Sequence, residues 1–112
     1  MTDRIVVLST CGSAEEAERL ARHLVETRVA ACVNILPGAR SIYRWEGKVE
    51  EAGEHLLLIK SVRERFSALR AEIERMHSYE VPEILALPVV DGSEAYLAWM
   101  GAETGDAGGT GE

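Results

Sequence analysis

The sequence predicts an α+β fold of the ferredoxin-like type, an antiparallel four-stranded sheet with two helices on one face. Three observations support this prediction. Strand-like and helix-like segments follow one another in the order βαββαβ, a long hairpin joins the second and third strands, and a short helix comes after the fourth strand. At 112 residues the chain suits a single domain. We place that domain at residues 1–100.

The first strand and helix are predicted from residue periodicity. Arg4–Ser9 is short and rich in β-branched residues, which is typical of a strand. Ser13 and Glu16 then form a capping-box pattern, which marks the start of a helix. Apolar residues recur behind it at helical spacing, and this spacing predicts a helix over Ala14–Thr27.

The next segment predicts a long β-hairpin. A strand over Val29–Ile35 is interrupted by Pro37-Gly38, where a bulge or kink is expected because proline cannot donate to the ladder. The strand resumes at Ser41–Trp45. Glu46-Gly47 then supplies a tight turn, and a third strand is expected over Lys48–Lys60.

The second half of the chain repeats the helix-then-strand order. A capping-box pattern at Ser61 and Glu64 introduces a helix, whose apolar residues recur at steps of three and four from Phe66 to Met76. The loop His77–Pro82 leads to a fourth strand over Glu83–Val90.

The chain is predicted to end in a short helix and a disordered tail. Asp91-Gly92 makes a turn, and Ser93–Met100 is expected to be helical. Residues 101–112 contain five glycines and three acidic residues, a composition that predicts disorder.

Composition argues against several classes of protein. Twelve basic and nineteen acidic residues give a net charge of −7, the opposite of the basic face that nucleic-acid binding needs. No run of 18 apolar residues is present, so no membrane span is expected. The first residues lack the features of a signal peptide, and the expected location is the cytoplasm.

The two cysteines are too few for a disulfide scaffold. Cys32 lies in an apolar run and is expected to pack as a small hydrophobic residue. Cys11 is expected in the loop between the first strand and the first helix, which would make it the more accessible thiol.

The predicted strands are apolar on both faces. Apolar runs occupy residues 5–8, 30–33, 56–59 and 84–87, whereas a half-solvated sheet should alternate apolar and polar residues. Two helices cover one face, so another copy of the chain is expected to cover the second.

Hairpin length leads to the same expectation. The third strand, fully extended, would reach about 40 Å at ~3.3 Å per residue. A domain of this size has a diameter of roughly 35 Å. The hairpin tip should therefore contact a neighbouring subunit, unless bulges coil the hairpin and keep it within its own subunit.

Motifs that run in order from Arg4 to Met100 resemble the CutA family of divalent-cation tolerance proteins. They are Leu24-Val25-Glu26, Ala30–Gly38, Ser41–Lys48, Lys60, His77–Ile84 and Tyr96–Met100. The resemblance implies a homotrimer with sheets facing inward and hairpins reaching to neighbours, and a role in tolerance of divalent cations, copper in particular. It also implies an architecture shared with trimeric nitrogen-regulatory signalling proteins.

The resemblance further implies a metal site at His77 and Glu83, which match family positions proposed to bind metal. Imidazole and carboxylate suit a weakly bound Cu²⁺ or another divalent cation. The alternatives from the residues themselves are a helix-capping role for His77 and an ion pair for Glu83. Some family members carry cysteine where this chain has Ser9, and the usual proline after the histidine is Ser78 here.

Four aromatic residues are expected at subunit interfaces and in the core, because an amphipathic ring buries a large area while its polar atom finds a partner. They are Tyr43, Trp45, Tyr96 and Trp99. The alternative is a ligand cleft between subunits, to which Lys60 and Tyr79 would contribute.

Enzyme motifs such as a nucleophile elbow or a phosphate-binding glycine loop are missing from the sequence. The expected function is therefore non-enzymatic metal binding and tolerance. The alternative is a signalling or adaptor trimer that binds a small ligand or a partner protein between its subunits.

Overall fold

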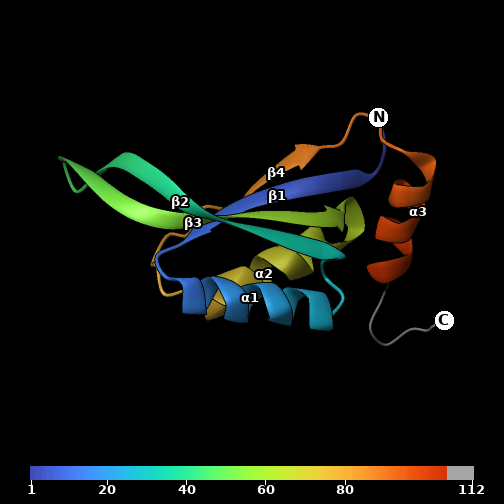
Figure 1. Cartoon of the computed structure of the whole chain (residues 1–112), viewed down its shortest axis with the longest axis horizontal. Helices are drawn as coiled ribbons and strands as arrows, with labels where there is room; N and C mark the ends of the chain where they lie inside the picture. Colours follow the sequence, from blue (N-terminus) through green and yellow to red (C-terminus); the bar gives the residue numbers. More distant parts are fainter. Residues whose placement is uncertain (106–112) are drawn as a thin grey trace.

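The computed structural model describes residues 1–105 and confirms the predicted order of elements (Figure 1). The elements are β1 (Arg4–Cys11), α1 (Ala14–Glu26), β2 (Cys32–Trp45), β3 (Lys48–Val62), a 3₁₀ turn (Arg63–Arg65), α2 (Phe66–Met76), β4 (Leu85–Pro88) and α3 (Glu94–Glu103). No helix among these residues is long and apolar enough to cross a membrane.

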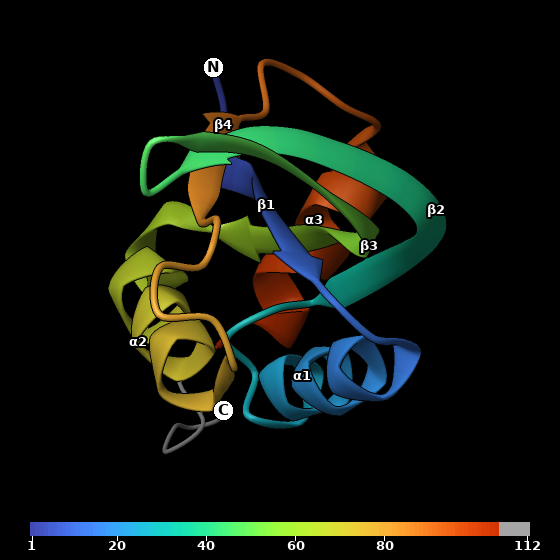
Figure 2. The ribbon, with the colours of Figure 1, turned by 90° about the vertical axis from the view of Figure 1, so that its left-hand side faces the viewer.

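The four strands form one antiparallel sheet in the order β2-β3-β1-β4. Helices α1 and α2 lie side by side against one face of this sheet (Figures 1 and 2). Among the described residues, only α3 contacts the other face, at one end, where Arg4 Nε donates to the Leu97 carbonyl at 2.8 Å. Helix α3 sits at the end of the sheet that is opposite the β2–β3 hairpin tip (Figure 1). The ferredoxin-like arrangement is therefore confirmed.

The core lies between the sheet and the pair α1 and α2. Its residues come alternately from the strands, so that every second side chain faces the helices. They include Ile5, Val7, Leu57 and Ile59 from the sheet and Leu20, Leu24, Leu69 and Ile73 from the helices.

The opposite face, which we call the open sheet face, is also apolar. Val6 pairs with Leu87 and Leu8 pairs with Leu85, and paired residues point to the same side of a sheet. Leu85 is 55% exposed and Leu87 is 46% exposed. The expected sheet is therefore present: it is apolar on both sides, and on the open sheet face helix α3 covers only one end.

The hairpin extends well beyond the body of the domain. The described chain measures 48 × 28 × 22 Å, and the hairpin tip forms one end of its long axis (Figure 1). The predicted bulge is confirmed, because the pairing register shifts between Leu36 and Ala39. At the tip, Glu46 and Gly47 have φ values of 50° and 81°, the paired positive angles of a type I′ turn.

One of the two predicted capping boxes is wrong, and the other is half formed. Ser13 Oγ accepts the Glu16 backbone N–H at 3.1 Å, as predicted, but the Glu16 carboxylate turns to Ser78 instead of returning to Ser13. Ser61 continues β3, where its hydroxyl donates to the Val29 carbonyl at 2.6 Å. Helix α2 accordingly starts after the 3₁₀ turn without a side-chain cap.

The prediction for Cys11 is also wrong. Cys11 is the last residue of β1 rather than a loop residue, and it pairs with His55. Alternation along β1 points its side chain to the helices, so it is fully buried, whereas Cys32 is partly exposed. Cys32 is thus the more accessible thiol.

Element boundaries differ at three further places. Strand β2 begins at Cys32, three residues after its predicted start at Val29. The fourth strand covers only Leu85–Pro88, so Glu83 precedes it. Helix α3 runs to Glu103, three residues beyond its predicted end, and Thr104 is buried. The expected disorder was placed at 101–112, of which 106–112 lie outside the described residues.

Candidate functional site

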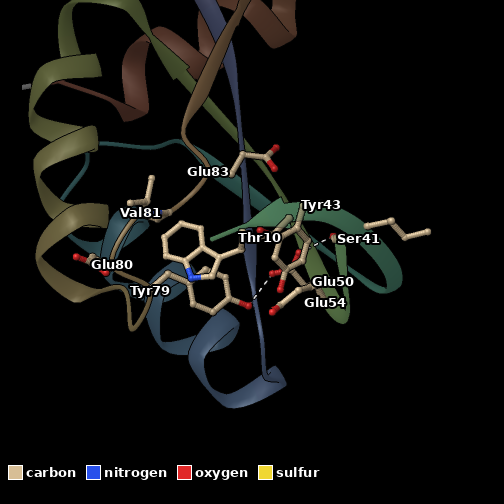
Figure 3. Close-up of a pocket in the computed structure, with 12 residues that line it drawn as sticks. Thr10, Ser41, Tyr43, Glu50, Glu54, Tyr79, Glu80, Val81 and Glu83 are labelled. Atoms are coloured by element: carbon tan, nitrogen blue, oxygen red, sulfur yellow. Dashed lines mark hydrogen bonds between the residues drawn. The ribbon is translucent and has the colours of Figure 1, made fainter. Parts of the chain in front are cut away.

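A cleft of about 730 Å³ opens between the outer half of the β2–β3 hairpin and the loop that follows α2 (Figure 3). We call it the hairpin cleft. Its lining residues come from β1, from both hairpin strands and from the loop. They are Thr10, Ser41, Ile42, Tyr43, Trp45, Glu50, Glu54, Tyr79, Glu80, Val81, Pro82 and Glu83.

The hairpin register places aromatic and acidic side chains together. Beyond the bulge, Tyr43 pairs with Glu50, and Ala39 pairs with Glu54. Paired residues and every second residue along a strand share one face, so Ser41 and Tyr43 lie on the same face as both glutamates. The two-residue turn fixes this register.

Glu54 is a buried carboxylate at the base of the cleft, only 7% exposed. Ser41 Oγ donates to its Oε1 at 2.5 Å, and Tyr79 Oη donates to its Oε2 at 2.6 Å (Figure 3). Burial would raise the pKa of Glu54, but hydrogen bonds from Ser41, Tyr79 and Thr10 outweigh it, and the pKa lies below its usual value. Glu54 is therefore ionised at neutral pH.

Tyr79 joins the loop to the hairpin. Burial and the neighbouring Glu54 charge raise the pKa of Tyr79, so its hydroxyl stays protonated and remains a donor. Its ring centroid lies 4.6 Å from that of His77.

His77 supports the loop from beneath. Its side chain is fully buried, and its Nδ1 accepts the Tyr79 backbone N–H at 3.0 Å. Nε2 therefore carries the proton and donates to the Thr10 carbonyl at 2.6 Å. With both ring nitrogens engaged, His77 fixes the position of Tyr79 relative to β1.

Glu16 ties the same loop to the start of α1. Its carboxylate accepts the Ser78 backbone N–H at 2.7 Å and the Ser78 hydroxyl at 3.1 Å. Its Oε2 also lies 3.6 Å from His77 Nδ1. The loop wall of the cleft is thus held by two buried side chains.

Cys11 lies next to His77 but behind the cleft. Its Sγ is 3.9 Å from His77 Nε2. Burial, reinforced by the charges of Glu16 and Glu54, raises the pKa of the thiol to about 12. A neutral, buried thiol is neither a nucleophile nor a ready metal ligand.

These residues do not fit a prebuilt metal centre. Among residues 1–105, no three His, Cys, Asp or Glu side chains are grouped so that they could surround a metal ion. Glu83 is exposed on the cleft, while both nitrogens of His77 are already used as described above. The two residues named for metal binding from the sequence therefore belong to one region but occupy different layers of it.

The other residues singled out in the sequence are spread over the molecule. Tyr43, Trp45 and Tyr79 line the hairpin cleft. Lys60 lies outside this cleft, on β3, where its Nζ donates to Asn34 Oδ1. The remaining aromatic pair, Tyr96 and Trp99, lies on α3 with ring centroids 5.4 Å apart.

Sequence reasoning missed Glu54, Ser41 and Glu16. The first two could have been found by counting back from the predicted Glu46-Gly47 turn, which places Ala39 opposite Glu54 with Ser41 next to it. No sequence signal pointed to Glu16, because its partner Ser78 is 62 residues away along the chain.

A family model and the relatives compared with this chain all carry the same family name. The family model described as "CutA1 divalent ion tolerance protein" matches residues 5–103. The "Divalent-cation tolerance protein CutA" of Thermus thermophilus is 50% identical over 100 residues, which are 89% of this chain and 97% of that protein. The "Protein CutA, chloroplastic" of Arabidopsis thaliana is 44% identical over 96 residues, 86% of this chain and 53% of that protein.

A solved structure agrees closely with the fold. The crystal structure of CutA from Xylella fastidiosa has a TM-score of 0.91 and 40% identity, and the match covers 93% of this chain and 100% of that one.

Proposed function

The chain belongs to the CutA1 divalent ion tolerance family, and on that premise we propose that it acts in divalent-cation tolerance as a non-enzymatic homotrimer. The protonation states of Glu54 and Tyr79 in the hairpin cleft, and of Cys11 behind it, support a role without catalysis. Glu54 has a lowered pKa, whereas Tyr79 and Cys11 have raised ones. A general acid or base works best with a pKa near the operating pH, and these three groups are shifted away from neutrality.

The open sheet face is the observation that supports assembly into an oligomer. Four leucine or valine side chains of β1 and β4 lie on this uncovered face. The sheet has two unlike edges, β2 and β4, so contact between them would be head-to-tail, which gives a ring when the rotation between subunits closes. The family resemblance favours three subunits. The tip of the hairpin and the aromatic pair on α3, at opposite ends of each subunit, would then approach neighbouring copies.

The proposed cation is Cu²⁺ or a related divalent ion, bound weakly. Glu83 is the accessible carboxylate, and His77 supplies a nitrogen only after the Tyr79 N–H leaves its Nδ1. Breaking that hydrogen bond costs about 1 kcal/mol. This cost would lower the affinity of the site for the cation about fivefold.

Calorimetric titration of Cu²⁺ tests this proposal. We expect Glu83→Gln and His77→Ala each to reduce Cu²⁺ uptake, while His23→Gln leaves it unchanged. His23 is a matched control, because it is a partly exposed histidine on α1, where it contacts Glu72 at 2.5 Å. Equal uptake by wild type and Glu83→Gln would remove the carboxylate from the site, even if His77→Ala fails to fold.

The size of the hairpin cleft favours a second function, a signalling or adaptor role that responds to a bound small molecule. A volume of about 730 Å³ lies within the range typical of ligand pockets. A ligand at 100-fold its dissociation constant should stabilise the protein by about 2.7 kcal/mol. Thermal unfolding in the presence of metabolite mixtures measures this effect, and the absence of any shift would contradict the role.

A further inference from the structure

We propose that the hairpin cleft binds an organic cation, an ammonium or guanidinium group carried on a short carbon chain. This inference rests on the ligand-binding role proposed above and assigns a chemical class to the ligand. It is argued from the charge of the cleft, the state of Glu54 and the aromatic walls.

The charge of the cleft is entirely negative. Four of its twelve lining residues are glutamates, and none is lysine, arginine or histidine. The glutamates also come from both sides, Glu50 and Glu54 from the hairpin and Glu80 and Glu83 from the loop. A concave surface lined by one sign of charge attracts ions of the opposite sign.

Glu54 provides a fixed anchor for such a cation. It is buried and ionised, yet its hydrogen bonds come from hydroxyl groups, and none of the ion pairs within residues 1–105 includes it. A carboxylate can accept about four hydrogen bonds, and the two hydroxyls leave room for more. An N–H donor that carries positive charge forms the stronger, charge-assisted kind of hydrogen bond.

The aromatic walls suit the carbon frame and the charge of an organic cation. Tyr43, Trp45 and Tyr79 are 42%, 41% and 37% exposed, so each presents part of its ring to the cleft region. Tyr43 and Tyr79 lie close to the Glu54 carboxylate (Figure 3). Aromatic faces attract ammonium and guanidinium groups, and the adjacent Val81 and Pro82 offer apolar contact to methylene groups.

A bare metal ion fits this cleft less well than an extended cation. A metal requires several ligands that converge on one point, and residues 1–105 contain no such group of three acidic, histidine or cysteine side chains. The glutamates are instead distributed around a space of about 730 Å³. A carbon chain with a charge at each end can reach two of them.

Calorimetry on the 112-residue protein, with a chelator to remove metal ions, tests the chemical class. The probes are 1,4-diaminobutane, n-butylammonium, neutral n-butanol and anionic butyrate, which share a four-carbon chain. We expect the diamine to bind more tightly than the monoamine, and the alcohol and the acid not to bind. Raising the salt concentration should weaken diamine binding, since the attraction is electrostatic.

Glutamine substitutions test whether the diamine binds in the hairpin cleft. Glu54→Gln should weaken diamine binding by about tenfold or more, the effect of losing a charge-assisted hydrogen bond. Glu83→Gln, a change at an exposed residue, should also weaken it. Glu51→Gln is the matched control, because Glu51 lies on the same strand but outside the cleft, bonded to Arg40. The Glu51→Gln variant should bind the diamine as tightly as the wild type does.

Three outcomes would overturn the inference. Equal binding of n-butanol and n-butylammonium, or equal weakening by Glu51→Gln, would exclude charge recognition in the cleft. Cleft binding of butyrate instead of the amines would leave the ligand-binding role in place with the wrong chemistry. No binding of any of the four probes, together with no shift from metabolite mixtures, would remove both proposals.

Discussion

Glu54 is a buried carboxylate that is stabilised by hydroxyl donors rather than by a cation. The Ser41 hydroxyl comes from the neighbouring strand, and the Tyr79 hydroxyl comes from the loop after α2. A hydrogen bond to a charged group contributes about 1.5–3 kcal/mol, more than one between neutral groups. The Tyr79 contact therefore holds the two walls of the cleft together while leaving a negative charge in it.

Removing the Tyr79 hydroxyl tests this contact. At pH 7 we expect Tyr79→Phe to lower the free energy of unfolding by about 1.5–3 kcal/mol, because Glu54 loses a donor. The folded-state pKa of Glu54 lies below 4.5, so the stability linked to its ionised form is complete above pH 4.5. That stability is lost as the pH falls through the folded-state pKa, and the difference between the two proteins should shrink in the same range.

Urea denaturation over a series of pH values measures the effect. Tyr43→Phe, in a similarly exposed tyrosine of the same cleft, should change stability by no more than about 0.5 kcal/mol. A Tyr79→Phe effect that does not vary with pH would show that the hydroxyl does not act through Glu54.

The two thiols should differ sharply in reactivity. Cys11 is fully buried with a pKa raised to about 12, so it should resist iodoacetamide at pH 8 as long as the protein is folded. Cys32→Ser leaves Cys11 as the single thiol, and mass spectrometry should detect its alkylation only in denaturant. Alkylation of Cys11 in the native Cys32→Ser protein would contradict the burial of β1's last residue.

At the scale of elements, the hairpin turn sets the register that builds the cleft. Glu46 adopts a φ of 50° in the type I′ turn, a left-handed conformation that glycine and asparagine tolerate better than glutamate. Strands β2 and β3 contribute most of the cleft's base. A turn with one defined conformation fixes their register and so keeps Tyr43 and Glu50 on the same face.

Improving the turn should stabilise the protein. We expect Glu46→Asn to raise the free energy of unfolding by about 0.5–1 kcal/mol, because Asn-Gly is the favoured type I′ pair. Gly47→Ala, at a φ of 81°, should lower it by about 1 kcal/mol. Urea midpoints at one fixed protein concentration measure both changes. Destabilisation by Glu46→Asn would mean that the turn differs from type I′.

The elements that sequence predicted well are those fixed by local pattern. Helix α1 ends one residue before its predicted end, and the bulge and the turn lie where proline and glycine indicated. Ser61 and Cys11 were misplaced because pairing overrides local pattern: Ile5 pairs with Ser61 and His55 pairs with Cys11, which extends both strands. The link from Tyr79 to Glu54 depends on the path of a loop, which no periodicity encodes.

At the scale of the whole molecule, the uncovered apolar face dominates. Exposed leucines on β4 and apolar residues on β1 form one side of the sheet, while α1 and α2 cover only the other (Figures 1 and 2). Exposed apolar patches of this kind mark interaction sites in soluble proteins. Assembly would bury this face in the same way as the helices bury the core.

A charge on the open sheet face should prevent assembly. We expect wild-type protein to have about three times the chain mass of 12.3 kDa in light scattering, and Leu85→Glu to have a mass close to that of one chain. Val25→Glu is the matched control, because Val25 is an exposed apolar residue on α1, 40% accessible, away from the sheet. A wild-type mass near 12.3 kDa would refute the trimer.

The single extra residue in β2 between Leu36 and Ala39 keeps the two halves of the hairpin in phase. Leu36 pairs with Leu56 and Ala39 pairs with Glu54, so the bulge accommodates the extra residue and Ser41 and Tyr43 stay on the face of the glutamates. Deleting Gly38 would remove the bulge and leave Ala39 opposite Glu54, because side chains alternate along a regular strand. A descendant could therefore lose this residue without changing which side chains meet in the acidic recess.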